Sequence, residues 1–378
     1  MTLGLALGLF AGLFLAFSNG ANDNFKGVAT LLGGKTASYK VALSWAAVTT
    51  LCGSIAAFFL ANKLMVNFSG KGLVADSIVH MTAFTVSVAI AAAITVFLAT
   101  KIGFPISTTH ALIGALIGSG FVASPTGLNL DKLYTSFFLP LLVSPLMAIV
   151  GALILYPAFS FMRRKFGVTR DSCLCIGNSV LAEAPQGTAQ GVLSATLNVD
   201  HLPQVSIGTK VTCEKRYVGH IWGFSAKSVL DYAHFLSAGL VSFARGLNDT
   251  PKIATVLLIG GTIGPMTSTG FVGLAIAIGG IMFVKKIAKT MSYDITEMND
   301  GQGFTGNFVT SLIVIGASRF GLPVSTTHVS CGSLFGIGAV TKKAHWRSIG
   351  KIIMAWIITL PAAAILGYIA FSLLKGHI

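Results

Sequence analysis

Long apolar stretches separated by short polar breaks are the feature that most constrains how this chain can fold. Of its 378 residues, 53% are hydrophobic and 10% are charged, whereas a soluble domain has about 25% charged residues. A bilayer core of about 30 Å needs about 20 apolar residues per helical span. The sequence therefore predicts an all-α polytopic membrane protein. Its apolar elements are Leu3–Leu32, Ala37–Ala61, Ser77–Thr100, Ile106–Ala123, Phe137–Phe161, Ser228–Ile259, Phe271–Val284, Phe304–Ala317, Val324–Val340 and Ile352–Leu374.

The basic residues predict one orientation in the membrane. The net charge is +14, and basic residues of membrane proteins collect in cytoplasmic loops. We therefore predict no nucleic-acid partner and a multi-pass protein of the cell (plasma or inner) membrane, with a cytoplasmic central loop and both termini outside. The basic clusters are Arg163, Arg164, Lys165 and Arg170; Lys285, Lys286 and Lys289; and Lys342, Lys343, Arg347 and Lys351.

Two segments of the chain occur twice, in the same order. Gly20–Asp23 (GAND) recurs as Gly246–Asp249 (GLND), and residues 101–110 (KIGFPISTTH) recur as 319–328 (RFGLPVSTTH). Paired matches of this kind indicate a duplicated fold.

The duplication divides the chain into three parts. We predict a first transmembrane repeat at 1–162, a cytoplasmic linker at 163–227 and a second repeat at 228–378. Each repeat crosses the membrane three or five times, depending on whether its Ser-Thr-Thr-His segment belongs to a re-entrant hairpin or to a full crossing. Because either number is odd, the second repeat is inverted, as in many secondary transporters.

Three of the five cysteines lie in the predicted linker. Cys173, Cys175 and Cys213 lack the usual spacing of a zinc site. An odd number of cysteines in a cytoplasmic loop also argues against a disulfide there.

Only two of the twelve acidic residues, Asp23 and Asp249, fall well inside apolar segments. An ionised side chain there costs several kcal/mol unless it faces a partner or a wet cavity. The surrounding glycines, together with Pro251, predict that the helices are interrupted at 18–23 and 245–251.

These interruptions predict an oxygen cage for a small cation. Exposed carbonyls, the amides of Asn22 and Asn248, and the carboxylates of Asp23 and Asp249 are hard ligands that suit sodium. The alternative is a structural hydrogen bond between helices.

The two Ser-Thr-Thr-His segments predict a site for an anion. Pro105 and Pro323 suit the first turn of a helix, and the residues after them suit N-terminal caps. The positive end of a helix binds tetrahedral oxyanions. A common helix start without a ligand is the alternative. The predicted anion ligands are Ser107, Thr108, Thr109, Ser325, Thr326 and Thr327, with Asn22 and Asn248.

Three further residue pairs are auxiliary candidates. The histidines could orient the loop, relay a proton, contact the anion or make a structural hydrogen bond. The residues at the bends could be interface anchors or anion partners. The two lysines could pair with the Asp three residues before them, which would neutralise the carboxylate and compete with a cation. These pairs are His110 and His328, Lys101 and Arg319, and Lys26 and Lys252.

The duplicated segments resemble those of the inorganic phosphate transporter (PiT) family, whose signature is a Gly-Ala-Asn-Asp segment near the start of each half. The matching residues are Gly20–Asp23 and Gly246–Asp249. The Pro-x-Ser-Thr-Thr-His segments are similar as well, so the resemblance covers both halves and leaves out only the central loop. It implies phosphate uptake coupled to sodium or protons by alternating access, often from a homodimer. It also implies that the Asn-Asp pairs and the Ser-Thr-Thr clusters line the substrate and cation sites.

Two features depart from the family pattern. Members commonly continue with Val-Ala-Asn after the Asp, whereas this chain has Asn24–Lys26 (NFK) and Thr250–Lys252 (TPK). The residue four before the second Asp is often His and is Arg245 here.

We therefore predict a secondary active transporter that imports inorganic phosphate by cation symport with alternating access. Sodium is the favoured coupling ion over the proton, and no cofactor is expected. The alternative is a proton-coupled sulfate permease of the same fold, because both anions are tetrahedral. An anion channel or a phosphate receptor would belong to other classes. An enzyme is not expected, since the sequence has no H-E-x-x-H, G-x-S-x-G or Walker motif.

Overall fold

The protein forms two compact units in the computed structural model, which describes residues 3–125, 127–169, 171–181, 198–199, 204–209, 217–258 and 263–377. The first unit consists of Met1–Pro157 and His234–Ile378, and the second consists of Ala158–Ala233. The division of the chain into repeats and linker remains a prediction.

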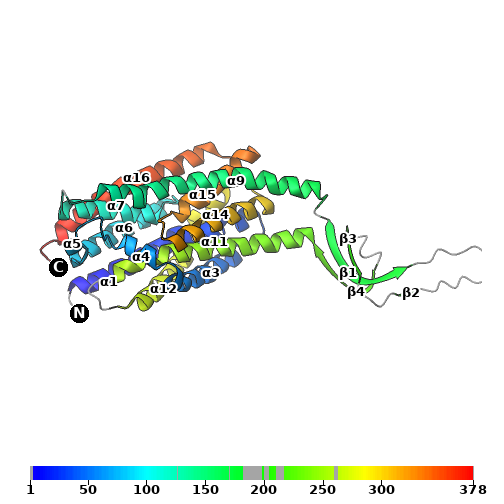
Figure 1. Cartoon of the computed structure of the whole chain (residues 1–378), viewed down its shortest axis with the longest axis horizontal. Helices are drawn as coiled ribbons and strands as arrows, with labels where there is room; N and C mark the ends of the chain where they lie inside the picture. The colour runs from blue at the N-terminus through cyan, green and yellow to red at the C-terminus, as the bar shows by residue number, and fades with distance from the viewer. Residues whose placement is uncertain are drawn as a thin grey trace, which may run out of the picture. The chain divides into compact units, whose positions relative to one another are not determined.

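Helices make up the first unit (Figure 1). Its first half contains α1 (Leu3–Asp23), the 3₁₀ turn η1 (Asn24–Gly27), α2 (Ala29–Gly33), α3 (Tyr39–Leu60), α4 (Asn62–Phe68), α5 (Asp76–Val79), α6 (Thr82–Ile102), α7 (Thr108–Ala123), α8 (Leu130–Leu133), the π-helical turn η2 (Tyr134–Phe138) and α9 (Leu139–Lys165). Its second half contains α11 (Ala226–Leu257), α12 (Pro265–Phe283), α13 (Lys285–Lys289), the π-helical turn η4 (Thr290–Asp294), α14 (Asp300–Phe320), α15 (Thr326–Thr341) and α16 (Trp346–Leu374). Helices α9 and α11 continue into the second unit.

Six segments of the described chain are long and apolar enough to cross a membrane. This confirms the predicted polytopic membrane protein. The six segments are Leu3–Gly27, Tyr39–Leu60, Thr82–Ile102, Leu130–Lys165, Pro265–Phe283 and Trp346–Leu374.

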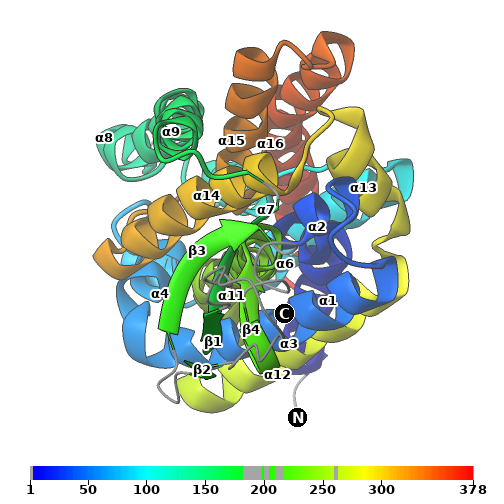
Figure 2. The ribbon, with the colours of Figure 1, turned by 90° about the vertical axis from the view of Figure 1, so that its right-hand side faces the viewer.

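The two Ser-Thr-Thr-His segments have the same local structure. Helices α6 and α14 end at Gly103 (φ 92°) and Gly321 (φ 76°), whose left-handed conformation turns the chain back on itself. Four residues later Ser107 and Ser325 cap α7 and α15, each accepting a hydrogen bond from the backbone N–H three residues on. Each half therefore contains a helix–turn–helix hairpin, α6–α7 in the first half and α14–α15 in the second, with α15 packed on α14 (Figure 2). Whether either hairpin is re-entrant remains a prediction.

The helix interruptions predicted at 18–23 and 245–251 are not found there. Helix α1 continues through Asp23, and only after this residue does the chain change to the 3₁₀ turn Asn24–Gly27. In the second half α11 continues unbroken through 245–251, so the interruption predicted there is wrong. Pro251 removes a single backbone donor, and membrane helices tolerate proline where the surrounding protein satisfies the freed backbone group.

The matched glycines bring helices of the two halves into close contact. A Cβ atom on Gly20 of α1 would lie 1.9 Å from the Ile276 carbonyl oxygen of α12. One on Gly246 of α11 would lie 2.2 Å from the Thr50 carbonyl oxygen of α3. In both motifs the glycine therefore allows the helix that carries the Asp to pack on the other half.

The glycines that follow the Ser-Thr-Thr-His segments act in the same way. A Cβ on Gly118 would lie 1.8 Å from the Ala364 carbonyl oxygen, so α7 packs closely along α16 (Figure 1). A Cβ on Gly336 of α15 would lie 2.7 Å from the Ile149 carbonyl oxygen of α9. Each hairpin helix is thus held by the last long helix of the other half.

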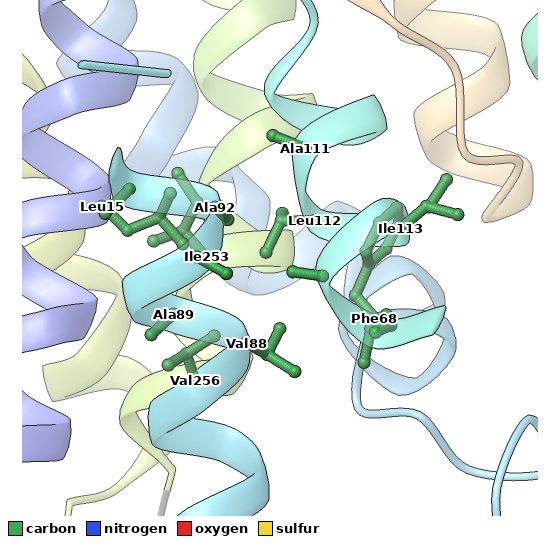
Figure 3. Packing of buried hydrophobic residues seen from close by; sticks show 14 of the residues in the cluster. Leu15, Phe68, Val88, Ala89, Ala92, Ala111, Leu112, Ile113, Ile253 and Val256 are labelled. Atoms are coloured by element: carbon green, nitrogen blue, oxygen red, sulfur yellow. The ribbon is translucent and has the colours of Figure 1, made fainter. Parts of the chain in front are cut away.

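An apolar core surrounds the polar residues of the two motifs. It joins residues of α1, α4, α6, α7, α11 and α12. Figure 3 shows Ala111 and Leu112, which directly follow the first Ser-Thr-Thr-His segment, and Ile253, which follows Lys252. The motif side chains are therefore enclosed in a low-dielectric surrounding.

The second unit contains a sheet that the sequence did not predict. Strand β1 (Ser172–Leu181) pairs antiparallel with β2 (Asn198–Val199), β3 (Gln204–Thr209) and β4 (Tyr217–Ser225) (Figure 2). Cys175 on β1 is buried and disulfide-bonded, whereas Cys173 is free. The expectation of a linker without a disulfide is therefore wrong, because an odd number of cysteines requires only that one of them stays unpaired.

Replacing Gly118 by alanine is expected to lower stability, because the new methyl group would meet the backbone of α16. Backbone atoms give way less easily than a flexible side chain, so we expect a cost of about 1–3 kcal/mol. Gly316→Ala in α14 is the matched control, since a Cβ there meets nothing within 4 Å. Alanine should stabilise that helix by up to about 1 kcal/mol. Thermal unfolding in detergent measures both, and equal unfolding temperatures would contradict the close approach.

Candidate functional site

The two motif aspartates lie at one buried point, joined by a single side chain. Asn19 Nδ2 lies 3.1 Å from Asp23 Oδ2 and 3.4 Å from Asp249 Oδ2. The same amide donates to Thr108 Oγ1 at 2.9 Å. Asn19 is one helical turn before Asp23 on α1, which directs both side chains to the same place. The two Asn-Asp segments, 226 residues apart in sequence, thus meet in space.

Lys26 connects the first Asn-Asp segment to the second hairpin. The η1 turn directs its Nζ back to Asp23, with which it forms an ion pair. The same Nζ donates to Asn22 Oδ1 at 2.8 Å, to the Ile106 carbonyl oxygen at 2.8 Å and to Thr327 Oγ1 at 2.7 Å. Four oxygen atoms from both halves therefore surround this ammonium group, which is buried.

Lys252 makes the corresponding contacts from the other half. Its Nζ lies 3.3 Å from Asp249 Oδ1, 2.8 Å from the Val324 carbonyl oxygen and 2.9 Å from Thr109 Oγ1. The Phe68 ring lies 5.6 Å from the same nitrogen, within the range of a cation–π contact. Each lysine thus binds its own aspartate and a threonine of the opposite hairpin.

The motif asparagines hold the hairpins in place. Asn22 Nδ2 donates to Thr100 Oγ1 at 2.9 Å and to the Phe104 carbonyl oxygen at 3.1 Å. Asn248 Nδ2 donates to the Val324 carbonyl oxygen at 3.2 Å, and its Oδ1 accepts from Ser318 Oγ at 3.2 Å. Both amides therefore fix the backbone between two helices, in addition to the ligand role that the sequence predicts for them.

The two Ser-Thr-Thr tips face each other. Their six side chains are buried, with at most 6% exposure. Thr327 Oγ1 donates to the Ile106 carbonyl oxygen at 2.9 Å, and Thr109 Oγ1 donates to the Val324 carbonyl oxygen at 3.4 Å. The N-termini of α7 and α15 thus meet at the buried charged side chains. The positive ends of both helix dipoles therefore act on the same site.

The motif histidines from the two halves also meet. The rings of His110 and His328 are 4.4 Å apart, and the Trp356 ring lies 3.9 Å from that of His328. Trp356 Nε1 donates to the Pro105 carbonyl oxygen at 3.1 Å. This aromatic group braces the first hairpin. The roles predicted for the histidines remain predictions.

Lys101 and Arg319, the residues at the bends, lie outside this cluster. Both are exposed. Lys101 Nζ lies 5.1 Å from the centre of the Phe97 ring, on its own helix. Of the two predicted roles, interface anchor and anion partner, this placement fits the interface anchor.

Arg245 and Asn19 are the site residues that the sequence analysis missed. Arg245 is 1% exposed, and of its guanidinium nitrogens only Nη2 has a partner, Asn24 Oδ1 at 3.5 Å. The signal was present in the repeat, because Asn19 and Arg245 occupy the same offset, four residues before Asp23 and Asp249. A polar side chain one turn before a buried aspartate shares its helix face.

The cluster carries one net positive charge. In the described part of the chain, five charged side chains are buried, namely Asp23, Asp249, Lys26, Lys252 and Arg245. Each lysine is paired with an aspartate, so the guanidinium is the charge without a counterion. A low-dielectric site of this kind attracts an anion.

The sequence model described as the phosphate transporter family matches residues 19–367. The chain belongs to the phosphate transporter family. The match includes both Asn-Asp segments and both Ser-Thr-Thr-His hairpins, so it confirms the resemblance drawn from those residues. Because this is a family of transporters, the chain is not an enzyme.

Individual relatives agree with the family. A Thermococcus kodakarensis protein named "Putative phosphate permease" is 28% identical, over 98% of this chain and 97% of its own length. A Rhizobium meliloti protein named "Probable low-affinity inorganic phosphate transporter" is 27% identical, over 97% and 96%. A solved structure titled "The sodium-dependent phosphate transporter" aligns over 100% of both chains with a TM-score of 0.74. This likeness, at 20% sequence identity, shows that the fold is shared.

Asp23→Asn is expected to destabilise the protein strongly, because it leaves the Lys26 ammonium buried without its counterion. Removing one partner of a buried pair costs roughly 3–5 kcal/mol. Asp131→Asn is the matched control, since that side chain is exposed. Thermal unfolding of the two variants measures the difference. If Asp23→Asn unfolds at the same temperature as the wild type, the ion pair contributes nothing to stability.

Proposed function

We propose that this chain imports inorganic phosphate as a secondary active transporter and binds it between the N-termini of α7 and α15. One observation carries the proposal. Two buried Ser-Thr-Thr tips from different halves converge on a cluster with one net positive charge. Hydroxyl groups and helix N-termini are the donors that tetrahedral oxyanions prefer.

The proposed anion ligands are the six hydroxyl residues of the tips, with Asn22 and Asn248 supporting them. Arg245 adds a charge that the sequence did not assign. Its Nε and Nη1 are buried donors without partners, and a guanidinium fork matches the geometry of phosphate. Donating to an anion would satisfy nitrogens whose burial is otherwise unfavourable.

The exchange of helices between halves supports alternating access. Helices α1 and α7 of the first half pack on α12 and α16 of the second, and α11 and α15 pack on α3 and α9. Two copies related by a pseudo-twofold axis in the membrane would produce this pattern, and such inverted repeats can rock about a central site.

A cavity beside the cluster is a candidate for the access route. It has a volume of about 160 Å³ and is lined in part by Phe68, Lys71, His80 and Thr255. Phe68 contacts both this cavity and the Lys252 ammonium. Rotation of the Phe68 side chain would then open the cluster to the cavity, and Lys71 in the cavity wall would attract an anion.

The coupling ion divides the proposal into two forms. Sodium symport, predicted from the oxygen cages at Asp23 and Asp249, requires the two lysine ammonium groups to leave the oxygens that they now contact. Proton coupling, the second prediction, makes no such demand. The solved structure of the same fold is named for sodium dependence, but a likeness at 20% identity carries the fold alone and does not decide the coupling ion of this chain.

Counterflow of labelled phosphate in liposomes tests the proposed function. Vesicles that contain the purified chain and unlabelled phosphate should accumulate labelled phosphate transiently, because a carrier exchanges solute at one site. Excess sulfate should suppress the signal weakly, whereas strong suppression would favour the sulfate permease. Passive currents without counterflow would indicate a channel and contradict the proposal.

Arg245→Gln provides a matched variant for this assay. It removes the uncompensated charge and keeps a polar side chain of similar length, so we expect counterflow to fall by at least about tenfold. Arg347→Gln, which changes an exposed residue in the first turn of α16, should leave counterflow unchanged. Wild-type counterflow in the Arg245 variant would exclude this residue from the anion site.

A further inference from the structure

The lysine ammonium groups occupy the positions that a small cation would take. Around Lys26 Nζ the oxygens are a carboxylate, an amide carbonyl, a backbone carbonyl and a threonine hydroxyl. Around Lys252 Nζ they are a carboxylate, a backbone carbonyl and a threonine hydroxyl. Hard oxygens of these kinds are the ligands of group 1 and group 2 cations in proteins.

We propose that Lys26 and Lys252 are built-in cations that replace bound sodium, so that this chain transports phosphate without sodium at Asp23 and Asp249. The inference rests on the proposed function, because it concerns how the charge of the anion is balanced. It also changes the expected coupling, since a tethered cation cannot cross the membrane with the substrate.

The contacts themselves argue against a second cation in either cage. Asp23 Oδ1 and Asp249 Oδ1 are already bound to ammonium nitrogens. A sodium ion sharing those oxygens would lie within a few ångströms of a like charge in a buried site, where repulsion is weakly screened. The cages that the sequence predicts are therefore complete without an added ion.

Tethering also favours the lysine over a free ion. Each ammonium is held three residues from its aspartate, so its effective concentration at the cage far exceeds that of dissolved sodium. Lys26 and Lys252 are 3% and 1% exposed, and their contacts reach the opposite hairpin through Thr327 and Thr109. Leaving the cage would break contacts to both halves at once.

The duplication provides an internal check on this arrangement. The two cages are built by different stretches of sequence, NDNFK and NDTPK, and by different backbones, a 3₁₀ turn after α1 and a continuous helix in α11. Both nevertheless place an ammonium on a carboxylate, a backbone carbonyl and a threonine hydroxyl. Two local structures that reach one result argue for a requirement of the site rather than for an accident of one turn.

The fixed side-chain charges also determine the net charge of the whole cluster. Each aspartate is neutralised within its own half, and Arg245 leaves one positive charge for the anion. Phosphate binding therefore needs no accompanying cation to compensate its first negative charge. Sodium should neither bind at the two cages nor stimulate exchange.

Counterflow in sodium-free medium is the direct test. When sodium is replaced by N-methylglucamine on both sides, wild-type exchange should change by less than about twofold, because an ion that does not bind shifts no equilibrium. A fall of about tenfold or more would overturn the inference while leaving the phosphate carrier in place.

The double variant Lys26→Asn/Lys252→Asn tests the replacement itself. The amide removes the charge and offers an oxygen, so the emptied cages should admit sodium and exchange should become sodium-dependent. Lys351→Asn, an exposed lysine of α16, is the matched control and should behave like the wild type. A double variant that still exchanges phosphate without sodium would contradict the proposal.

Thermal unfolding gives a second measurement that does not depend on transport. Sodium should raise the unfolding temperature of the double variant and leave that of the wild type unchanged, relative to N-methylglucamine at equal ionic strength, because a ligand stabilises the state that binds it. A sodium-dependent rise in the wild type would overturn the inference. This outcome is separate from a wild type without counterflow, which would refute the proposed function. If the double variant does not fold, the two wild-type measurements still decide.

Discussion

Two buried ion pairs hold this structure together at its centre. Lys26 and Lys252 each bind the aspartate of their own half and a threonine of the other, so each lysine also joins the two halves. Inside an apolar core such pairs persist only when the remaining polar atoms are satisfied. The hairpin carbonyls and the motif asparagines supply those partners, which explains why the motifs combine Asn, Asp, Ser and Thr at fixed spacing.

The glycines make this centre geometrically possible. Gly20 and Gly246 let the two aspartate helices approach their neighbours at backbone distance, and Gly118 and Gly336 do the same for the hairpin helices. These close approaches occur between the halves. Helices of each half therefore pack against helices of the other half around the cluster. Backbone packing and charge pairing therefore depend on each other, since a looser crossing would admit water and weaken the pairs.

Sequence patterns predicted the site better than the backbone that carries it. The duplicated Asn-Asp and Ser-Thr-Thr segments identified the residues that meet, because a buried aspartate and a capped helix start have few uses in a membrane. The interruptions predicted at 18–23 and 245–251 were wrong, because glycine and proline lower helix propensity only locally and packing overrides that preference in both helices. Arg245 was missed because its role depends on contacts across helices. The sheet formed by β1, β2, β3 and β4 was missed because its strands lie in the polar segment between the two halves and pair with partners distant in sequence.

The central claim is that both halves bind one anion at a cluster whose cations are lysines. An experimental structure with phosphate, determined in sodium-free buffer, tests it most directly. We predict anion density in contact with hydroxyl groups of both α7 and α15, with the ammonium groups of Lys26 and Lys252 still on the two aspartates. Density that contacts only one half, or lysines displaced from the carboxylates, would contradict the account.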